Sequence, residues 1–211
     1  MGTFITFEGI EGCGKTTQIN LLKAYLLKKN YTVQITREPG GTRIGDQIRK
    51  ILLSDKNHAI SDKTELLLYE ACRAQHIKEV ILPALKEDKI VLCDRFADST
   101  LAYQGYGRKI DLGFIQRLDH IVAGELRPDL TILLDMDVDS GLQRAKNRNS
   151  KVTESEREER FEKETLEFHE RIRKGFLELA EKDRKRIRII DGSKSVDEIQ
   201  KIIRDLIEEI L

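Results

Sequence analysis

A complete phosphate-binding motif lies near the amino terminus of the 211-residue chain. The pattern G-x-x-x-x-G-K-[ST] is matched by Gly9-Ile10-Glu11-Gly12-Cys13-Gly14-Lys15-Thr16, and Thr17 follows. Glycines let backbone N–H groups converge on phosphate oxygens, and the start of a helix adds positive potential there. In such a loop Lys15 reaches the β- and γ-phosphates, and the Thr16 hydroxyl coordinates Mg²⁺. We therefore expect residues 9–16, called the P-loop below, to bind a nucleoside triphosphate.

The segments around the P-loop fit the same interpretation. Residues 3–7 form a compact apolar run that is typical of a buried strand, and Leu21, Leu22 and Leu27 continue an amphipathic helical pattern. A chance glycine turn before a helix is the alternative. Because strand, loop and helix follow one another in the order that phosphate binding requires, the sequence favours the nucleotide site.

A carboxylate and a guanidinium follow a second apolar run. Asp94 and Arg95 come directly after residues 90–93, so we expect both charges at the carboxyl edge of a parallel sheet, where α/β proteins bind their ligands. An aspartate there can hold Mg²⁺ or its water, and an arginine can bind a second phosphate through two hydrogen bonds. An isolated Asp-Arg pair is more often a surface ion pair, but its place beside a P-loop favours the ligand role.

Two further groups of residues could bind an organic substrate. The motif Arg37-Glu38-Pro39-Gly40-Gly41-Thr42 follows the apolar residues 33–36, although Pro-Gly-Gly also suits an ordinary turn. Tyr69 and Arg73 are four residues apart on a helical pattern and so share one face. An aromatic ring beside a guanidinium could hold a nucleobase by stacking and a directed hydrogen bond. Core packing of Tyr69 with a surface role for Arg73 is the alternative.

These groups need a scaffold, and the apolar runs predict an α/β fold. Five short runs alternate with helical patterns, at residues 3–7, 33–36, 90–93, 131–134 and 187–190. The runs lack polar alternation, as expected for parallel strands that helices cover on both faces. The clearest helix follows a capping box of Ser195 and Glu198 and continues to Ile210. No linker or repeat divides the chain, so we predict one domain over residues 1–211.

One stretch is dense in charges of both signs. Over residues 156–185 a thin apolar stripe among these charges predicts a long, solvated, salt-bridged helix. The stripe consists of Leu166, Phe168, Ile172, Phe176 and Leu179. Residues 145–154 have little apolar content and are expected to form a mobile flap.

Composition narrows the class of protein. Apolar residues make up 39% of the chain and charged residues 35%, which argues against a disordered or membrane protein. Lys and Arg equal Asp and Glu at 37 each, so no excess charge attracts nucleic acid or an acidic membrane, and we expect neither partner. The cysteines, Cys13, Cys72 and Cys93, are too scattered for a disulfide framework or zinc site and suit the cytoplasm.

Taken in order along nearly the whole chain, these motifs resemble the thymidylate kinase family. The resemblance rests on Phe7-Glu8 with the P-loop and Thr17, Arg37-Glu38-Pro39-Gly40-Gly41-Thr42, Arg73-Ala74-Gln75-His76, Asp94-Arg95-Phe96, Ser99-Thr100 and Tyr103-Gln104-Gly105. It implies a three-layer fold of the P-loop NTPase type, with a five-stranded parallel sheet and a mobile lid at about residues 144–160. It also implies a homodimer that transfers the γ-phosphoryl group of ATP to dTMP, with Mg²⁺, to form ADP and dTDP for dTTP synthesis.

The resemblance implies roles at the ATP side of the site. ATP would be bound by Gly9, Ile10, Glu11, Gly12, Cys13, Gly14, Lys15, Thr16 and Thr17, with adenine near Arg144. Mg²⁺ would lie near Thr16 and Asp94. The catalytic set would be Lys15, Asp94, Arg95 and Arg148.

The resemblance also implies roles toward dTMP. Glu11 would accept a hydrogen bond from the sugar 3′-hydroxyl, and Arg95, helped by Arg49, would hold the acceptor phosphate. Tyr69 would stack on thymine, and Arg73 would point at its O4. The remaining residues of the dTMP site would be Glu38, Pro39, Ser99, Thr100, Tyr103 and Gln104, with Tyr103 crowding the 2′ position.

The family divides by the place of its catalytic arginine. Gly12 follows Glu11 where one class has an arginine, so the chain resembles the bacterial class, whose lid supplies it. Arg148 matches that lid position best. The chain departs from the pattern at Asn149, which replaces a usual glycine, and at Glu159, which replaces an aspartate. Arg157 and Arg160 therefore remain alternatives.

Two other functions stay open at this point. A kinase acting on a different nucleoside or nucleoside monophosphate would share the P-loop, although Glu38-Pro39-Gly40-Gly41 argues against it. A GTPase-type switch would share it too, but the chain has neither an Asp-x-x-Gly after a strand nor an Asn-Lys-x-Asp motif.

Overall fold

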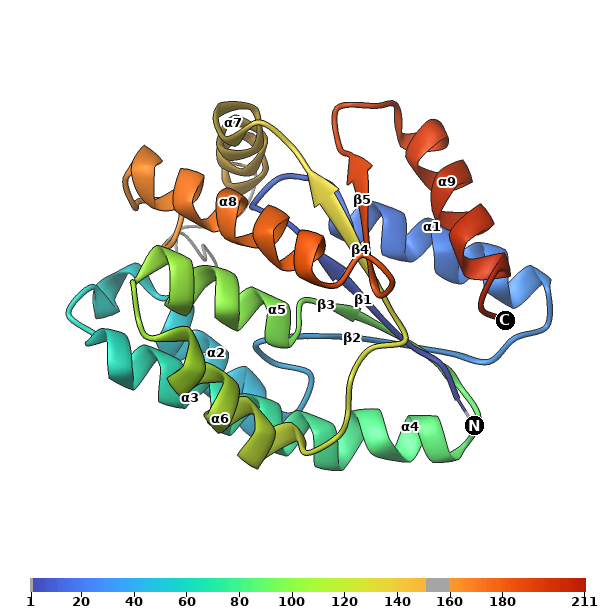
Figure 1. The fold of residues 1–211 in the computed structure, drawn as a ribbon, viewed down its shortest axis with the longest axis horizontal. Coiled ribbons are helices and arrows are strands. Elements are labelled where there is room, and N and C mark those ends of the chain that lie inside the picture. The colour runs from blue at the N-terminus through green and yellow to red at the C-terminus, as the bar shows by residue number, and fades with distance from the viewer. Residues whose placement is uncertain (1, 151–159) are drawn as a thin grey trace.

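The computed structural model describes residues 2–150 and 160–211, which fold around a five-stranded parallel sheet (Figure 1). The strands are β1 (Phe4–Glu8), β2 (Val33–Arg37), β3 (Ile90–Asp94), β4 (Leu130–Asp135) and β5 (Ile187–Asp191), in the order β2-β3-β1-β4-β5. Every boundary lies within one residue of its predicted place. The α/β fold with a parallel sheet is confirmed.

Helices flank this sheet, as the unbroken burial of its central strands requires. They are α1 (Lys15–Lys28), α2 (Arg43–Leu53), α3 (Asp62–His76), α4 (Leu82–Lys86), α5 (Ala97–Thr100), α6 (Leu112–Ala123), α7 (Val138–Asn149), α8 (Leu166–Lys182) and α9 (Val196–Glu208). Short turns of other helical type are η1 (Asp55–Asn57), η2 (Ile77–Ile81) and η3 (Leu101–Gly107). No helix in the described part of the chain is long and apolar enough to cross a bilayer.

The core is built from aliphatic and aromatic strand residues and from the apolar face of each helix that covers the sheet. Leu22 and Leu26 of α1 pack with Ile203 and Ile207 of α9 in the cluster that contains β1 and β4. Helices begin at capping residues that can be recognised in the sequence. In particular, the predicted capping box of Ser195 and Glu198 is present at the start of α9.

The charged stretch differs from its prediction. Thr165 caps the helix by accepting a hydrogen bond from the Phe168 N–H, so α8 begins at Leu166 and not at residue 156. The expectation of a solvated helix is also wrong for one face, because Phe168, Ile172 and Phe176 are buried. This face packs against η3, which explains the thin apolar stripe.

The expected flap also begins differently. Residues 145–149 are the last residues of α7, and Ala145 is completely buried. They therefore belong to the helical layer and do not form a separate flap. Ser150 is the C-cap of α7, and residues 151–154 lie outside the described residues.

Candidate active site

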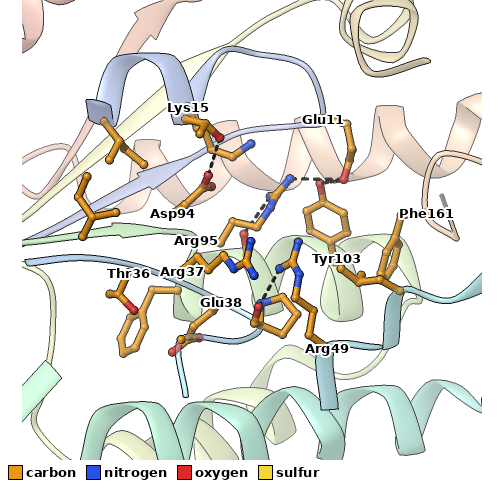
Figure 2. Close-up of a pocket in the computed structure, with 18 of the residues that line it drawn as sticks. Glu11, Lys15, Thr36, Arg37, Glu38, Arg49, Asp94, Arg95, Tyr103 and Phe161 are labelled. Carbon is orange, nitrogen blue, oxygen red and sulfur yellow. Dashed lines mark hydrogen bonds and ion pairs between the residues drawn. The ribbon is translucent and has the colours of Figure 1, made fainter. Parts of the chain in front are cut away.

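The sequence motifs meet in one cavity of about 1020 Å³ at the carboxyl ends of β1, β2 and β3 (Figure 2). The P-loop forms one wall, and the segments that follow β2 and β3 form the opposite side. Residues of α3, η3 and α7 complete the lining. The predicted position of Asp94 and Arg95 at the carboxyl edge of the sheet is confirmed.

Lys15 lies in the P-loop fold and is 8% exposed. Its Nζ donates to the carbonyl oxygens of Gly9 at 3.1 Å and Ile10 at 3.0 Å. Gly12 has φ of 71°, and a Cβ there would lie 2.1 Å from the carbonyl oxygen of Gly141 in α7. A side chain at residue 12 would therefore separate the P-loop from the helix that carries Arg144 and Arg148.

Arg95 lies across the cavity from the body of the P-loop yet reaches it. Its Nη1 donates to the Gly9 carbonyl at 2.9 Å, the same oxygen that accepts from Lys15. It also donates to Ser99 Oγ at 3.1 Å, and its guanidinium carbon lies 4.8 Å from the centre of the Tyr103 ring. Two cations from different motifs thus converge on one point, as binding of two neighbouring phosphate groups requires.

Thr16 and Asp94 form a second pair at the cavity. The Thr16 hydroxyl donates to Asp94 Oδ2 at 3.1 Å. Hydroxyl and carboxylate oxygens are the ligands that Mg²⁺ prefers. Among residues 2–150 and 160–211, no cluster of three or more His, Cys, Asp or Glu residues could hold a metal ion.

Two hydrogen-bond donors and one histidine ring contact the Glu11 carboxylate. Oε1 accepts from the Tyr103 hydroxyl at 2.5 Å and from Arg95 Nη2 at 3.4 Å, and Oε2 lies 3.5 Å from His169 Nδ1. Burial alone would raise the pKa of Glu11, but the contacts with His169, Arg95 and Tyr103 outweigh it and hold that pKa well below its usual range. Glu11 is therefore an ionised acceptor.

Arg73 is completely enclosed, at 1% exposure, which excludes the surface role left open above. Nε donates to Glu38 at 3.0 Å, Nη1 to Glu70 at 2.7 Å and Nη2 to Thr100 at 2.7 Å. Asp119 lies 3.5 Å from Nη1. Burial, opposed by Arg73, raises the pKa of Glu70 and of Asp119.

The other residues assigned to dTMP surround this arginine. Tyr69 is half-buried at the cavity wall, with its ring centre 6.5 Å from that of Phe161. Arg49 Nη1 donates to the Pro39 carbonyl at 2.7 Å, and Gln104 donates to Glu65 at 2.8 Å. The structure places in the cavity lining Glu38, Pro39, Arg49, Tyr69, Arg73, Ser99, Thr100, Tyr103 and Gln104.

The three candidate lid arginines have different surroundings. Arg148, at the end of α7, lines the cavity, and its Nη2 lies 3.1 Å from Glu162 Oε1. Arg160 is buried and donates to the Leu52 carbonyl and, at 2.7 Å, to Glu65. Arg157 lies outside the described residues. The structure thus brings Arg148 to the cavity and holds Arg160 against α2 and α3.

Sequence reasoning missed several residues of the site. Arg37 was quoted only as part of a motif, yet it lines the cavity beside Arg49 and Arg95 (Figure 2). Phe161 and Glu162 also line it, but the charge-dense stretch around them hid the aromatic signal. Arg37 could have been found from its place at the end of a strand next to β3, where it lies opposite Asp94.

Glu8 was likewise quoted only as part of a motif, with no role assigned to it. It is 1% exposed at the end of β1, where it accepts from the Phe96 N–H at 2.7 Å and the Ser99 hydroxyl at 2.5 Å. Burial and then the charge of Asp98 raise the pKa of Glu8 to about 7. Through these two hydrogen bonds, Glu8 holds the segment that carries Arg95.

Glu8 predicts a pH dependence of stability. The Glu8 carboxyl loses its proton near pH 4.5 in the unfolded chain and near pH 7 in the folded chain. The contribution of Glu8 to the free energy of unfolding therefore falls as pH rises through that window and is constant above it. In Glu8→Gln this slope is absent. The variant is therefore expected to gain about 3 kcal/mol relative to the parent chain between pH 4 and pH 8. Urea unfolding of both proteins across that range measures it, and parallel curves would contradict the burial of an ionisable Glu8.

Comparison with known proteins agrees with this arrangement. A family model described as thymidylate kinase matches residues 7–203. The thymidylate kinase of Geotalea daltonii is 57% identical, over 94% of this chain and 92% of its own, and that of Geobacter sulfurreducens is 56% identical, over 98% and 97%. The crystal structure of thymidylate kinase from Ehrlichia chaffeensis matches with a TM-score of 0.78 and 34% identity, covering 98% of each chain. The chain therefore belongs to the thymidylate kinase family.

Proposed function

We propose that this chain transfers the γ-phosphoryl group of ATP to dTMP in the cavity between the P-loop and the segment after β3, forming ADP and dTDP for dTTP synthesis. The observation that carries this proposal is the convergence of Lys15 and Arg95 on the Gly9 carbonyl. Donor and acceptor phosphates bound by these two cations would be neighbours.

Phosphoryl transfer requires positioning and charge neutralisation more than covalent chemistry. We therefore assign no protein nucleophile. A dTMP phosphate oxygen attacks the γ-phosphorus in line with the departing ADP oxygen. Lys15, Arg95 and Arg148 offset the negative charge of the group in transit. Arg49 and Arg37 support the acceptor phosphate from the other side of the cavity (Figure 2).

Thr16 and Asp94 would hold Mg²⁺, directly or through its water. Their oxygens lie 3.1 Å apart at the cavity wall, and both are hard donors that fit this ion. When bound with ATP, the ion neutralises phosphate charge and fixes the phosphate chain. We expect chelation of the metal by EDTA to abolish turnover and added Mg²⁺ to restore it.

Recognition of dTMP would use both ends of the nucleoside. Glu11 would accept from the 3′-hydroxyl, Tyr69 would stack on thymine, and Tyr103 would crowd a ribose 2′-hydroxyl. Within residues 2–150 and 160–211, Arg73 Nη2 has one hydrogen-bond partner, Thr100. Its second N–H would donate to thymine O4, with Gln104 nearby.

We further propose that the enzyme is a cytoplasmic homodimer built from one catalytic domain over residues 1–211. The helices α2, α3 and α6 lie together in Figure 1 and expose apolar side chains that a second copy would cover. These are Ile44, Ile51, Leu67, Phe114 and Ile121. The three cysteines are buried free thiols, which suits a reducing compartment. Light scattering that gave the mass of a single 24.3 kDa chain would contradict the dimer.

The lid is assigned to residues 144–160, of which 144–150 and 160 are described. We assign to it the exclusion of water, which would otherwise accept the phosphoryl group and hydrolyse ATP. Arg148, at the end of α7, already lines the cavity at the start of this segment.

A panel of acceptors tests the function. ADP release from ATP and Mg²⁺ is measured with each nucleoside monophosphate in turn and with none. We expect dTMP to be the best acceptor and dUMP a weaker one, because the thymine methyl is worth only ~1–3 kcal/mol in an apolar pocket. Equal rates with and without dTMP would show a hydrolase instead, and a better acceptor of another class would replace dTMP.

A further inference from the structure

A buried histidine on α8 touches the P-loop from behind the cavity. His169 is completely enclosed, and its ring lies edge-on to Phe168 with centres 5.5 Å apart. Its Nε2 is 3.0 Å from the carbonyl oxygen of Phe161, and its Nδ1 is 3.5 Å from Glu11 Oε2. One imidazole therefore bridges two segments separated by 150 positions of sequence, Glu11 and Phe161.

The chemistry of the two partners determines what this ring does. A backbone carbonyl only accepts hydrogen bonds, so Nε2 must be the donor to Phe161. An ionised carboxylate also only accepts, so the contact with Glu11 is favourable when Nδ1 carries a proton as well. Among the described residues, neither Glu11 Oε2 nor His169 Nδ1 has a hydrogen-bond partner, and the two atoms face each other at 3.5 Å as an ion-pair contact. The orientation of this carboxylate oxygen thus depends on His169.

The opposite oxygen of Glu11 is held by residues of the acceptor site. Oε1 accepts from Tyr103 at 2.5 Å and from Arg95 at 3.4 Å. Tyr103 and Arg95 both donate to Oε1, so these two hydrogen bonds alone would leave the carboxylate free to rotate about the Cγ–Cδ bond of Glu11. His169 removes this freedom by contacting the second oxygen.

The other partner of His169 links the contact to the end of the lid. The Phe161 ring packs edge-on against Tyr103, with centres 5.4 Å apart, and lines the cavity near Tyr69. The next residue, Glu162, pairs with Arg148. The histidine therefore connects the carboxylate in the P-loop with the segment that positions the lid arginine.

We propose that His169 is a positioning residue for recognition of the acceptor sugar: it holds the Glu11 carboxylate so that this group accepts a hydrogen bond from the 3′-hydroxyl of dTMP. The inference rests on the proposed role of Glu11. His169 does not itself touch the nucleotide. Replacement of His169 should therefore weaken the binding only of acceptor nucleotides that carry a 3′-hydroxyl.

The test compares dTMP with 3′-deoxythymidine monophosphate, which lacks that hydroxyl. Phenylalanine keeps an aromatic ring but removes both nitrogens. We expect His169→Phe to raise the KM for dTMP about tenfold, with changes of less than twofold for the 3′-deoxy substrate and for ATP. The preference for dTMP over its 3′-deoxy analogue should fall by the same tenfold. Tyr106→Phe, which removes a hydrogen bond between η3 and Glu178 of α8, is the matched control and should leave the preference unchanged.

Parallel measurements on Glu11→Gln separate the two possible failures. If Glu11→Gln does not reduce the preference, the sugar role of Glu11 is wrong, and that part of the proposed function fails. If Glu11→Gln reduces it but His169→Phe does not, the inference about His169 fails alone. An equal loss on both nucleotides in His169→Phe would also overturn it, because a general packing defect acts on every substrate.

A second measurement keeps the proposal testable if His169→Phe does not fold. His169→Gln carries both of its N–H donors on one nitrogen, so it cannot reach both acceptors that the two separate ring nitrogens face, and a smaller loss of the same preference is expected. An unchanged preference for dTMP over its 3′-deoxy analogue in His169→Gln would contradict the proposal.

Discussion

Replacing Arg148 by alanine is expected to lower kcat by roughly 10³-fold or more, with a much smaller change in the KM for ATP. The guanidinium lies at the carboxyl end of α7, lines the cavity and is 62% exposed, so it can reach a bound phosphate. Its charge matters most when negative charge is spread over the group in transit. Single-turnover measurements with saturating dTMP would separate this effect from binding.

Arg160→Ala is the comparison for Arg148. Arg160 is buried against Glu65 and the Leu52 carbonyl, so its loss should reduce stability far more than it reduces kcat in the folded protein. Turnover near that of the parent enzyme in Arg148→Ala would remove Arg148 from the mechanism. Arg157, outside the described residues, would then be the first alternative to examine.

The second large effect is expected at Arg73. Arg73→Ala removes the only cation that contacts Glu38, Glu70 and Asp119 together within the described part of the chain, and leaves these carboxylates buried. We expect a loss of about 3–5 kcal/mol in the free energy of unfolding, measured with urea. Glu70→Gln retains Arg73 and the other two carboxylates, and should cost less.

The same substitution tests how the base is selected. Cytosine presents an amino donor where thymine has O4, so Arg73 would face a donor and lose its hydrogen bond in a buried site. The measurement uses folded Arg73→Ala, stabilised with ligand where needed. The ratio of kcat/KM for dTMP to kcat/KM for dCMP should fall sharply in this variant. An unchanged ratio would show that another group reads the base.

Local patterns predicted most of the scaffold. The five strands were found because β-branched runs between helical patterns leave a clear signal in a parallel sheet. The P-loop and the capping box of Ser195 and Glu198 were found because their chemistry is set by residues close together in sequence. The common cavity followed from a topological rule, since the carboxyl ends of neighbouring parallel strands share one edge.

Contacts between distant residues could not be predicted in this way. A surface role for Arg73 stayed open in the sequence because no local pattern shows that Glu38, just after β2, and Asp119, from α6, enclose it. The start of α8 was misplaced because charges of both signs continue through the turn before Thr165. His169 was passed over because its partners are not local: Glu11 is 158 positions away in the P-loop, and Phe161 precedes the start of its own helix.

The central claim is that one cavity holds both nucleotides with their phosphates between Lys15 and Arg95. Inhibition by a compound that joins adenosine and thymidine through a chain of phosphates tests it most directly. We expect this compound to compete with ATP and also with dTMP, with one molecule bound per chain. Inhibition that is competitive with one substrate and unaffected by the other would place the two nucleotides in separate sites and contradict it.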